Sequence, residues 1–331
     1  MKLLHPGHTN LRVTPIGLGL AALGRPGYIN LNHKADMPSK TDVASMEHHV
    51  FNMLDLAYEL GIRHFDAARS YGMAEEFLGK WLRRQRFSKN ELTVSSKWGY
   101  SYTAGWRINV STHEVKDHSL QQLKRQWDET ITHLGDYLDW YQIHSATLES
   151  GVLDNKEVLN RLEQIRDAGI AIGLTLSGNN QAEVLEKALR MRSGNRLFFD
   201  TVQATYNVLE PSAGEVLYKA HDMGMGVLIK EVLANGRLTA KNQSEAFADK
   251  RRVLEEQARR FSTTIDAIAI KFALEKPFVD SVLSGAATAD QLRQNLHALE
   301  IPWDNTAETA MRSLSEPPEA YWQTRKSLPW N

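Results

Sequence analysis

The feature that most constrains the fold is a regular alternation between short apolar runs and longer segments whose apolar residues recur at helical spacing. Eight such pairs follow one another along the 331 residues. The runs expected to form strands are Val13–Leu20, His64–Asp66, Leu92–Lys97, Leu138–His144, Ile170–Leu176, Thr201–Ala204, Met225–Lys230 and Val279–Leu283. The segments expected to form helices are 46–60, Glu75–Arg84, Ser119–Leu134, Asn155–Ala168, Gln181–Leu189, Ala213–His221, 245–260 with 264–274, and Thr288–Leu299. Eight strand–helix repeats in a chain of this length favour a closed parallel barrel over an open sheet.

Three further segments complete the expected architecture. Residues 2–14 alternate around a turn that contains Pro6 and Gly7, and this pattern predicts a β-hairpin. Residues 24–44 and 99–118 are rich in polar residues and are expected to be long loops. The composition does not change along the chain and no linker is evident, so we expect one domain over residues 1–331. The predicted fold is an α/β (β/α)8 TIM barrel with an N-terminal β-hairpin and long loops at the C-terminal mouth.

The overall charge and composition exclude several classes of function. The 39 basic and 40 acidic residues nearly cancel, which gives no support for a nucleic-acid or membrane partner. The absence of cysteine excludes disulfides, thiolate metal sites and a cysteine nucleophile. No run is apolar enough for a signal peptide or a membrane span. We therefore expect a cytoplasmic globular protein that acts on a small molecule, while its oligomeric state stays open.

Ionisable side chains close several of the predicted strands. Asp66, Lys97 and His144 end three successive strands, and Tyr71 lies on the loop after the first of them. In a parallel barrel these strand ends meet at one mouth, where active sites occur. Each residue alone has an ordinary structural explanation as a turn former or a surface group, but the four together at one mouth are much less expected by chance.

The four residue types suggest acid–base chemistry at an oxygen atom. Tyrosine is a poor acid because its ordinary pKa is about 10, and a nearby ammonium group is expected to lower that value. A carboxylate beside the lysine would hold it charged and in place. An imidazole can donate a hydrogen bond to a substrate oxygen. The set is suited to moving a proton at a carbonyl or alcohol oxygen.

Two other patterns were weighed against this interpretation. Gly17, Gly19 and Ala22 fit G-x-G-x-x-A, but a polar loop follows where a dinucleotide-binding Rossmann motif requires a helix. His113 and His118 lack partners at ligand-like spacing, so no metal site is predicted.

At this point the chain resembles the aldo-keto reductase superfamily. The matching stretches are Phe65–Gly72, Val94–Lys97, Asp139–His144, Val202-Gln203 with Tyr206-Asn207, and Ser284–Asn295. The resemblance implies reversible hydride transfer between a nicotinamide cofactor and a carbonyl/alcohol pair. It further implies that Tyr71 is the general acid/base, that Lys97 paired with Asp66 lowers its pKa, and that His144 orients the carbonyl oxygen.

The resemblance also implies a set of cofactor contacts. These are Gly19, Leu20, Ala21, Asp66, Thr175, Gln203, Ile229, Lys230, Gly285, Ala287, Gln291 and Asn295. Gln203 would hold the nicotinamide carboxamide, and the segment 285–295 would bind the adenosine end. NADPH is the expected cofactor. NADH is the alternative, because Ala286 and Ala287 stand where many members carry a basic residue for the 2′-phosphate, and Arg293 lies one turn further on.

The substrate is less constrained than the chemistry. Trp98 and Trp106 belong to an aromatic cluster after the Lys97 strand and are candidate substrate contacts, although a packed loop explains the cluster equally well. Sugars or other small carbonyl compounds are the candidate substrates. Two other functions stay open: a cofactor-binding regulatory subunit without turnover, and a TIM-barrel lyase or isomerase that uses the lysine in a Schiff base.

Overall fold

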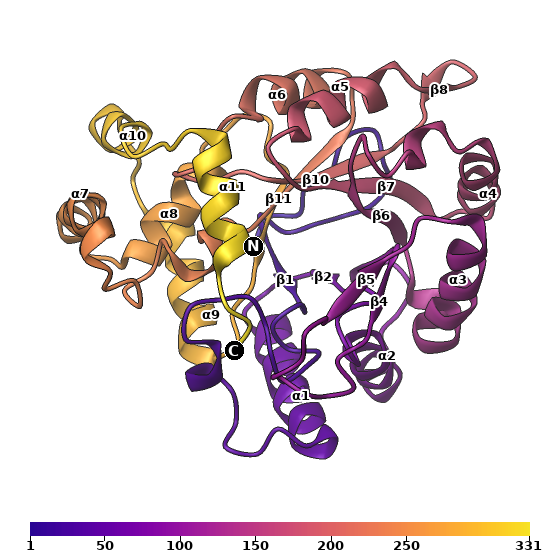
Figure 1. Ribbon diagram of the computed structural model, residues 1–331, viewed down its shortest axis with the longest axis horizontal. Helices are drawn as coiled ribbons and strands as arrows, with labels where there is room; N and C mark the ends of the chain where they lie inside the picture. Colours follow the sequence, from indigo (N-terminus) through magenta and orange to yellow (C-terminus); the bar gives the residue numbers. More distant parts are fainter.

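The structure is a computed structural model that describes residues 1–331, and its centre is a closed barrel of eight parallel strands (Figure 1). The strands, in their order around the barrel, are β1 (Ile16–Gly19), β2 (His64–Asp66), β3 (Thr93–Trp98), β6 (Trp140–Ala146), β7 (Ala171–Leu176), β10 (Thr201–Thr205), β11 (Gly226–Lys230) and β12 (Ser281–Ser284), which pairs again with β1. Each strand therefore neighbours the next barrel strand in sequence. The predicted α/β (β/α)8 barrel is confirmed.

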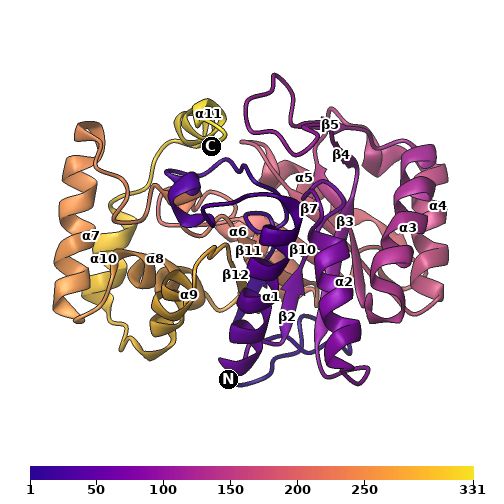
Figure 2. The same ribbon diagram turned by 90° about the horizontal axis from the view of Figure 1, so that it is seen from below.

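Most of the α-helices surround the barrel on its outside, and α11 lies over its mouth (Figures 1 and 2). They are α1 (Val43–Glu59), α2 (Ala74–Gln85), α3 (Leu120–Leu134), α4 (Lys156–Asp167), α5 (Gln181–Arg190), α6 (Gly214–Asp222), α7 (Ala248–Arg260), α8 (Ile265–Leu274), α9 (Ala289–Leu296), α10 (Asn305–Arg312) and α11 (Pro318–Ser327). Several begin at a side chain that accepts a backbone N–H of the first turn, as Ser119 does for α3 and Thr288 for α9. Such caps satisfy amides that have no partner within the helix, and they fix where each helix begins.

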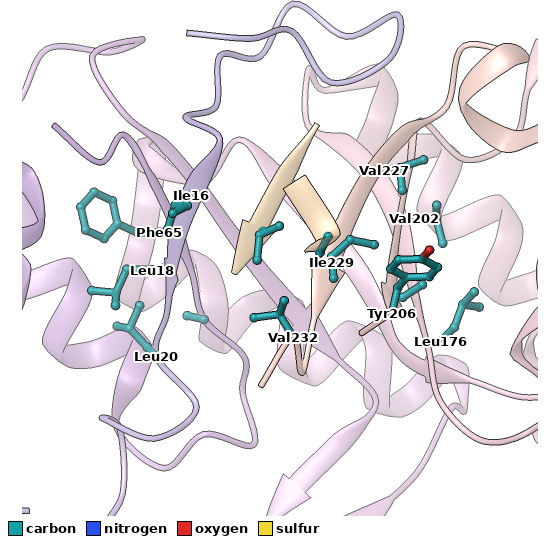
Figure 3. Close-up of a cluster of buried hydrophobic side chains, with 14 of the residues drawn as sticks. Ile16, Leu18, Leu20, Phe65, Leu176, Val202, Tyr206, Val227, Ile229 and Val232 are labelled. Carbon is teal, nitrogen blue, oxygen red and sulfur yellow. The ribbon is translucent and has the colours of Figure 1, made fainter. Parts of the chain in front are cut away.

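The apolar side chains of strands and helices form one contiguous cluster of 77 buried residues. Figure 3 shows part of it, with Ile16 and Leu18 of β1 near Phe65 of β2, and Val227 of β11 near Val202 of β10. Since side chains of a strand alternate between its two faces, the residues between these apolar positions face the barrel interior. The core thus holds the strands at fixed positions, and with them the polar residues at their C-terminal ends.

Short strands and 3-10 helices lie outside the barrel. The predicted N-terminal hairpin is present as a single antiparallel bridge between Leu4 and Val13. The loop 99–118 contains an unpredicted hairpin of β4 (Tyr100–Tyr102) and β5 (Glu114–Lys116), and β8 (Arg192–Ser193) pairs with β9 (Arg196–Leu197). The 3-10 helices are η1 (His33–Asp36), η2 (Gly135–Tyr137), η3 (Val152–Asp154), η4 (Ala234–Gly236), η5 (Glu245–Phe247) and η6 (His297–Glu300).

The last thirty residues bring a second unpredicted feature to the mouth. Helix α11 and the chain after it lie at the same end of the molecule as β4 and β5, and the N-terminus lies at the other end (Figure 2). Trp330 pairs with Ile29, and the backbone N–H of Asn331 donates to the Tyr28 carbonyl at 3.2 Å. The mouth is therefore bordered by segments from both ends of the sequence. None of the helices combines the length and apolar character needed to cross a bilayer.

Candidate active site

A cavity of about 490 Å³ opens at the C-terminal ends of the barrel strands. Its walls come from the ends of β1, β2, β10, β11 and β12, from the β4–β5 hairpin and from α11. Residues far apart in sequence thus share one site, as is usual at the mouth of a (β/α)8 barrel.

The structure brings together the four residues that the sequence singled out. Lys97 is fully buried, forms an ion pair with Asp66, and donates to the Ala67 carbonyl at 2.8 Å. Its Nζ lies 4.8 Å from the centre of the Tyr71 ring. The Tyr71 hydroxyl lies 3.5 Å from Nε2 of His144, and the two rings meet edge to face. Tyr71, His144 and Asp66 line the cavity, whereas Lys97 lies behind them.

Asp66 is held by more than its ion pair. Oδ1 accepts a hydrogen bond from the Ser95 hydroxyl at 2.7 Å and longer ones from the amides of Gln142 and Gln203 at 3.3 Å. Behind Ser95, Nε2 of His64 lies 3.0 Å from the Ser95 Oγ. A buried carboxylate needs several donors to offset its lost hydration, so this chain of contacts fixes the orientation of Asp66.

Burial determines the protonation state of the two cavity-facing residues. It raises the pKa of Tyr71 well above the ordinary value, and the negative charge of Asp66 raises it further. The lowering that the sequence predicted is therefore not seen, because desolvation of the phenolate and the charge of Asp66 outweigh the positive charge of Arg25, which lowers the pKa. Burial, followed by the charges of Lys97 and Lys230, lowers the pKa of His144 well below its usual range. At neutral pH the site holds a phenol and a neutral imidazole.

The expected cofactor contacts divide into two groups. Those that line the cavity are Gly19, Ala21, Asp66, Gln203, Lys230, Gly285, Gln291 and Asn295. Leu20, Ile229 and Ala287 instead belong to the hydrophobic core, and the Thr175 hydroxyl accepts the Ser145 N–H at 2.8 Å within the barrel. Side chains along an extended chain point alternately to its two sides. Because Gly19 and Lys230 face the cavity, their neighbours Leu20 and Ile229 point away from it.

Neither candidate substrate residue reaches the cavity. Trp98 is fully buried beneath the β4–β5 hairpin, with its ring 5.5 Å from that of His118. Trp106 donates its indole N–H to the Thr41 carbonyl at 2.6 Å and packs against Phe77. This corrects the sequence expectation. The aromatic rings that do line the cavity include Tyr28, Tyr100 and Trp330.

A half-buried charge cluster occupies the end of β11. Glu231 accepts the Arg325 side chain through both carboxylate oxygens, at 2.9 and 3.1 Å from Nε, and also the Thr205 hydroxyl at 3.2 Å. Burial raises the pKa of Glu231, but Arg325 and Lys230 outweigh it and bring that pKa to about 2. Lys230 donates to the Thr205 Oγ1 at 2.9 Å and has no carboxylate partner, and burial lowers its pKa to about 8.

Several residues of the cavity wall were not predicted from the sequence. They are Arg25, Tyr28, Glu114, Arg325 and Trp330. Arg25 and Tyr28 lie in a stretch that its glycines and prolines mark as loop, and such a stretch carries no period that would indicate where a side chain points. Arg325 could have been found from the apolar and basic spacing of 318–327, which forms α11. No group of three or more His, Asp or Glu side chains is arranged to bind a metal ion.

The polar groups of the cavity fit a nicotinamide dinucleotide. Gln203 offers an amide beside Asp66, and Lys230 offers a cation without a carboxylate partner. A Cβ at Gly285 would have no atom within 4 Å, which leaves room for a ligand against the backbone before α9. Asn295 borders the cavity, and its Oδ1 has no protein donor. The donors and acceptors therefore match a carboxamide, a phosphate and a base.

Comparison with known proteins agrees with this chemistry. The model of the Aldo/keto reductase family matches residues 15–316. The D-threo-aldose 1-dehydrogenase of a Pseudomonas species is 29% identical over 80% of this chain and 88% of its own length. The pyridoxal 4-dehydrogenase of Microbacterium luteolum is 27% identical over 93% of this chain and 95% of its own. The L-glyceraldehyde 3-phosphate reductase of Escherichia coli K12 is 25% identical, with 94% and 91% covered.

Solved structures show the same fold. An aldo-keto reductase from Bacillus halodurans in its holo form superposes with a TM-score of 0.72 at 22% identity, covering 96% of this chain and 97% of its own. The family match spans nearly all of the barrel and the strand ends that carry Asp66, Tyr71, Lys97 and His144. The chain belongs to the aldo/keto reductase family and is an NAD(P)H-dependent oxidoreductase.

Proposed function

We propose that the protein catalyses reversible reduction of an aldehyde or ketone to the corresponding alcohol, with Tyr71 as the general acid/base. The observation that carries this proposal is the contact between the Tyr71 hydroxyl and His144 Nε2 at the cavity wall, with the Lys97–Asp66 ion pair behind it. Sugars and other small carbonyl compounds are the candidate substrates. When bound, the nicotinamide supplies the hydride in reduction and accepts it in oxidation.

The protein side chains have distinct roles in this reaction. A carbonyl oxygen placed against Tyr71 and His144 accepts hydrogen bonds from the phenol and, in the Nε2–H tautomer, from the neutral imidazole. In reduction, Tyr71 transfers its proton to that oxygen as the carbonyl carbon gains the hydride. The phenolate left behind is costly in a buried site, and the Lys97 ammonium nearby offsets part of that cost. Asp66 keeps Lys97 charged and in place.

We assign the cofactor contacts to the residues that line the cavity. Gln203 holds the carboxamide, Lys230 faces the pyrophosphate, and Gly285, Gln291 and Asn295 border the adenosine. The choice between NADPH, the usual cofactor of the family, and NADH depends on the 2′ position. NADH is favoured by the position of Arg293, which does not line the cavity and pairs with Asp290 at 3.6 Å; Asp266 and Lys241, of opposite charge, both line the cavity.

A tyrosine substitution tests the mechanism. Tyr71→Phe removes the proton donor and leaves the ring, so turnover should fall by about 10²-fold or more, the size of a general acid–base contribution. Titration of tryptophan fluorescence with NADPH and NADH should give unchanged affinities in the variant. Activity like that of the wild type in Tyr71→Phe would refute the role of Tyr71. The ratio of the two affinities in the wild type decides the cofactor.

Two other functions predict different results. A regulatory subunit would bind nucleotide tightly and turn over no carbonyl compound. A Schiff-base enzyme would form a covalent adduct at Lys97 that borohydride traps. The position of Lys97 opposes the second, because its Nζ is fully buried, is bonded to Asp66 and Ala67, and does not line the cavity.

A further inference from the structure

The loop that follows β1 packs directly against the turn that carries Tyr71. The Gly24 carbonyl accepts the Met73 N–H at 2.8 Å, and a Cβ at Gly24 would collide with the Tyr71 carbonyl oxygen. A Cβ at Gly72 would collide with the Gly24 carbonyl oxygen and lie 2.8 Å from the Arg25 Cβ. Both positions hold glycine because the two backbones touch. Arg25, the next residue of the loop, is therefore fixed beside Tyr71 by backbone contacts.

The Arg25 side chain joins this turn to the β4–β5 hairpin. Its Nη1 donates to the Ser70 carbonyl at 2.8 Å and to Glu114 at 2.6 Å. Its Cζ lies 5.6 Å from the centre of the Tyr71 ring and 4.7 Å from that of Trp330. Only 2% of the residue is exposed, and hydrogen bonds that involve a buried charge are strong. The guanidinium thus restrains both the backbone before Tyr71 and the space beside its ring.

Ionisable groups surround Tyr71 from every element that packs against it. They are Asp66 of β2, Lys97 of β3, His144 of β6, Glu114 of β5, and Arg25 and Tyr28 of the loop after β1. Burial contributes most to the pKa of Tyr71 and raises it, followed by Asp66 and Tyr28, which also raise it. Glu114 raises that pKa as well, whereas Arg25 lowers it. The two members of the Arg25–Glu114 ion pair therefore act on the Tyr71 phenolate with opposite signs.

We propose that Arg25 is a positioning residue for Tyr71, which holds the proton donor in place and whose charge offsets part of the cost of the phenolate. The inference rests on the proposed function and adds a residue to the same site. Arg25 acts through its bond to the Ser70 carbonyl and through its place beside the ring, while Glu114 orients the guanidinium. The Lys97 Nζ lies nearer to the ring centre, at 4.8 Å, so Arg25 is the second cation of the site.

Substitutions of Arg25 test this role with uncharged substrates. Propanal and benzaldehyde, with the matching alcohols, carry no group that needs a cation, so their turnover reports on Tyr71. Arg25→Gln removes the charge, and kcat should fall about tenfold in both directions, the size of a screened interaction between two charges several ångströms apart. Arg25→Lys keeps the charge and should recover part of that loss. The affinity for NAD(P)H, from tryptophan fluorescence, should change less than about twofold in either variant.

A double variant shows whether Arg25 acts through Tyr71. No phenolate forms at this position in Tyr71→Phe, so the addition of Arg25→Gln should lower the residual kcat less than about twofold. The combined loss is then smaller than the product of the two single losses, as expected for residues that act as one unit. An equal loss of about tenfold in both backgrounds would mean that Arg25 acts on the fold or on the substrate and not on Tyr71.

Glu114 provides a test of opposite sign. Oxidation of an alcohol uses the phenolate of Tyr71, so its rate rises with pH towards the pKa of that group. Arg25→Gln should move this rising limb to higher pH, whereas Glu114→Gln removes the opposing carboxylate and should move it to lower pH. Arg190→Gln and Glu186→Gln are matched controls. These two residues pair with each other on α5 at 3.9 Å, do not line the cavity, and should leave the limb in place.

The outcomes separate the inference from the function on which it rests. A purely structural role would lower the rates of Arg25→Gln and Glu114→Gln without moving their limbs in opposite directions, and that result would overturn the inference while carbonyl reduction stands. If Arg25→Gln does not fold, Glu114→Gln decides, because the inference requires its limb at lower pH than in the wild type. If the wild type binds nucleotide but turns over none of these compounds, the proposed function fails, and the inference fails with it.

Discussion

At the scale of single residues, adjacent positions of β3 send their hydroxyls to two different buried carboxylates. Ser95 donates to Asp66 at 2.7 Å, and Ser96 donates to Glu75 at 2.5 Å. Both serines are fully buried. Asp66 belongs to the proposed catalytic group, whereas Glu75 lies on α2 and pairs with Arg69 at 2.9 Å. Alanine substitutions at the two serines therefore form a matched pair. One tests the orientation of Asp66 in the proposed active site, and the other tests the stability of the fold.

Ser95→Ala removes the shortest hydrogen bond to Oδ1 of Asp66 and leaves that oxygen only the two long amide contacts, while the ion pair between Lys97 and Oδ2 stays in place. We expect kcat to fall several-fold, and the limb of the pH–rate profile that belongs to Tyr71 to move to higher pH. The sign follows from the lost O–H dipole, because it had partly neutralised the carboxylate charge that raises the pKa of Tyr71. Ser96→Ala should lower the free energy of unfolding by about 1–3 kcal/mol and keep the wild-type profile. Identical pH profiles for both variants and the wild type would contradict the role of Ser95.

We expect Lys230 to make nucleotide binding dependent on pH. Burial lowers its pKa to about 8, so the side chain is charged below that value and neutral above it. A pyrophosphate binds the charged form, hence the affinity for NAD(P)H should decline as pH rises through about 8, by at most tenfold per unit for one proton. Lys230→Met should bind weakly at all pH values, without this slope. Lys124→Met, which changes an exposed lysine of α3 that does not line the cavity, should keep it. A slope that persists in Lys230→Met would exclude Lys230 as its source.

At the scale of elements, a single ion pair joins the C-terminal helix to the barrel. Arg325 of α11 is bonded to Glu231, which follows β11. The Glu231 backbone has a positive φ of 53°, and its carbonyl accepts the Asn207 amide at 3.0 Å. Residues other than glycine rarely adopt this backbone conformation, so the contacts around Glu231 hold it there. The pair thus connects the position of α11 to the shape of the cavity.

Arg325→Ala leaves the Glu231 carboxylate buried without its partner. We expect the free energy of unfolding to fall by about 2–4 kcal/mol, somewhat less than for a fully buried pair because the arginine is one quarter exposed. Urea denaturation measures this loss. Glu231→Gln in the Arg325→Ala background should recover part of it, and Lys326→Ala, which has no ion pair to lose, should change little. Independent, additive losses in the double variant would show that the two residues do not interact.

At the scale of the whole molecule, the barrel interior and the mouth differ in whether a glycine can be replaced by alanine. A Cβ at Gly173 in β7 would collide with the Thr201 hydroxyl and lie 2.7 Å from the Trp140 indole nitrogen. A Cβ at Gly285 would meet no protein atom, although it would enter the cavity. The interior is packed to support the fold, whereas the mouth leaves space for ligands.

Gly173→Ala should therefore lower the free energy of unfolding by about 1–3 kcal/mol, the usual cost of overpacking, and leave the affinity for NAD(P)H unchanged. Gly285→Ala should do the reverse and weaken nucleotide binding without loss of stability. Thermal unfolding and fluorescence titration of both variants measure the two effects. Weaker nucleotide binding in Gly173→Ala together with normal binding in Gly285→Ala would contradict this division.

The amino-acid sequence by itself determined the closed barrel and the residues that carry the proposed chemistry. Eight strand–helix repeats produce the barrel because each strand must bury its apolar face against the next helix. The strand ends then bring Asp66, Lys97 and His144 to one mouth, so their positions follow from the element count alone. His64–Asp66 has the predicted bounds, and the other barrel strands differ from their predicted bounds only at the ends.

Only the tertiary structure decided which side chains face the cavity and which protonation states they hold. Leu20, Thr175, Ile229 and Ala287 turn away, as do Trp98 and Trp106. The two-residue period makes side chains alternate along a strand, but it does not tell which of the two sets faces the cavity, and a loop has no such period. Arg25, Glu114 and Arg325 converge from segments separated by up to 300 residues. The high pKa of Tyr71 has the same origin, because desolvation depends on everything packed around the ring and not on its neighbours in sequence.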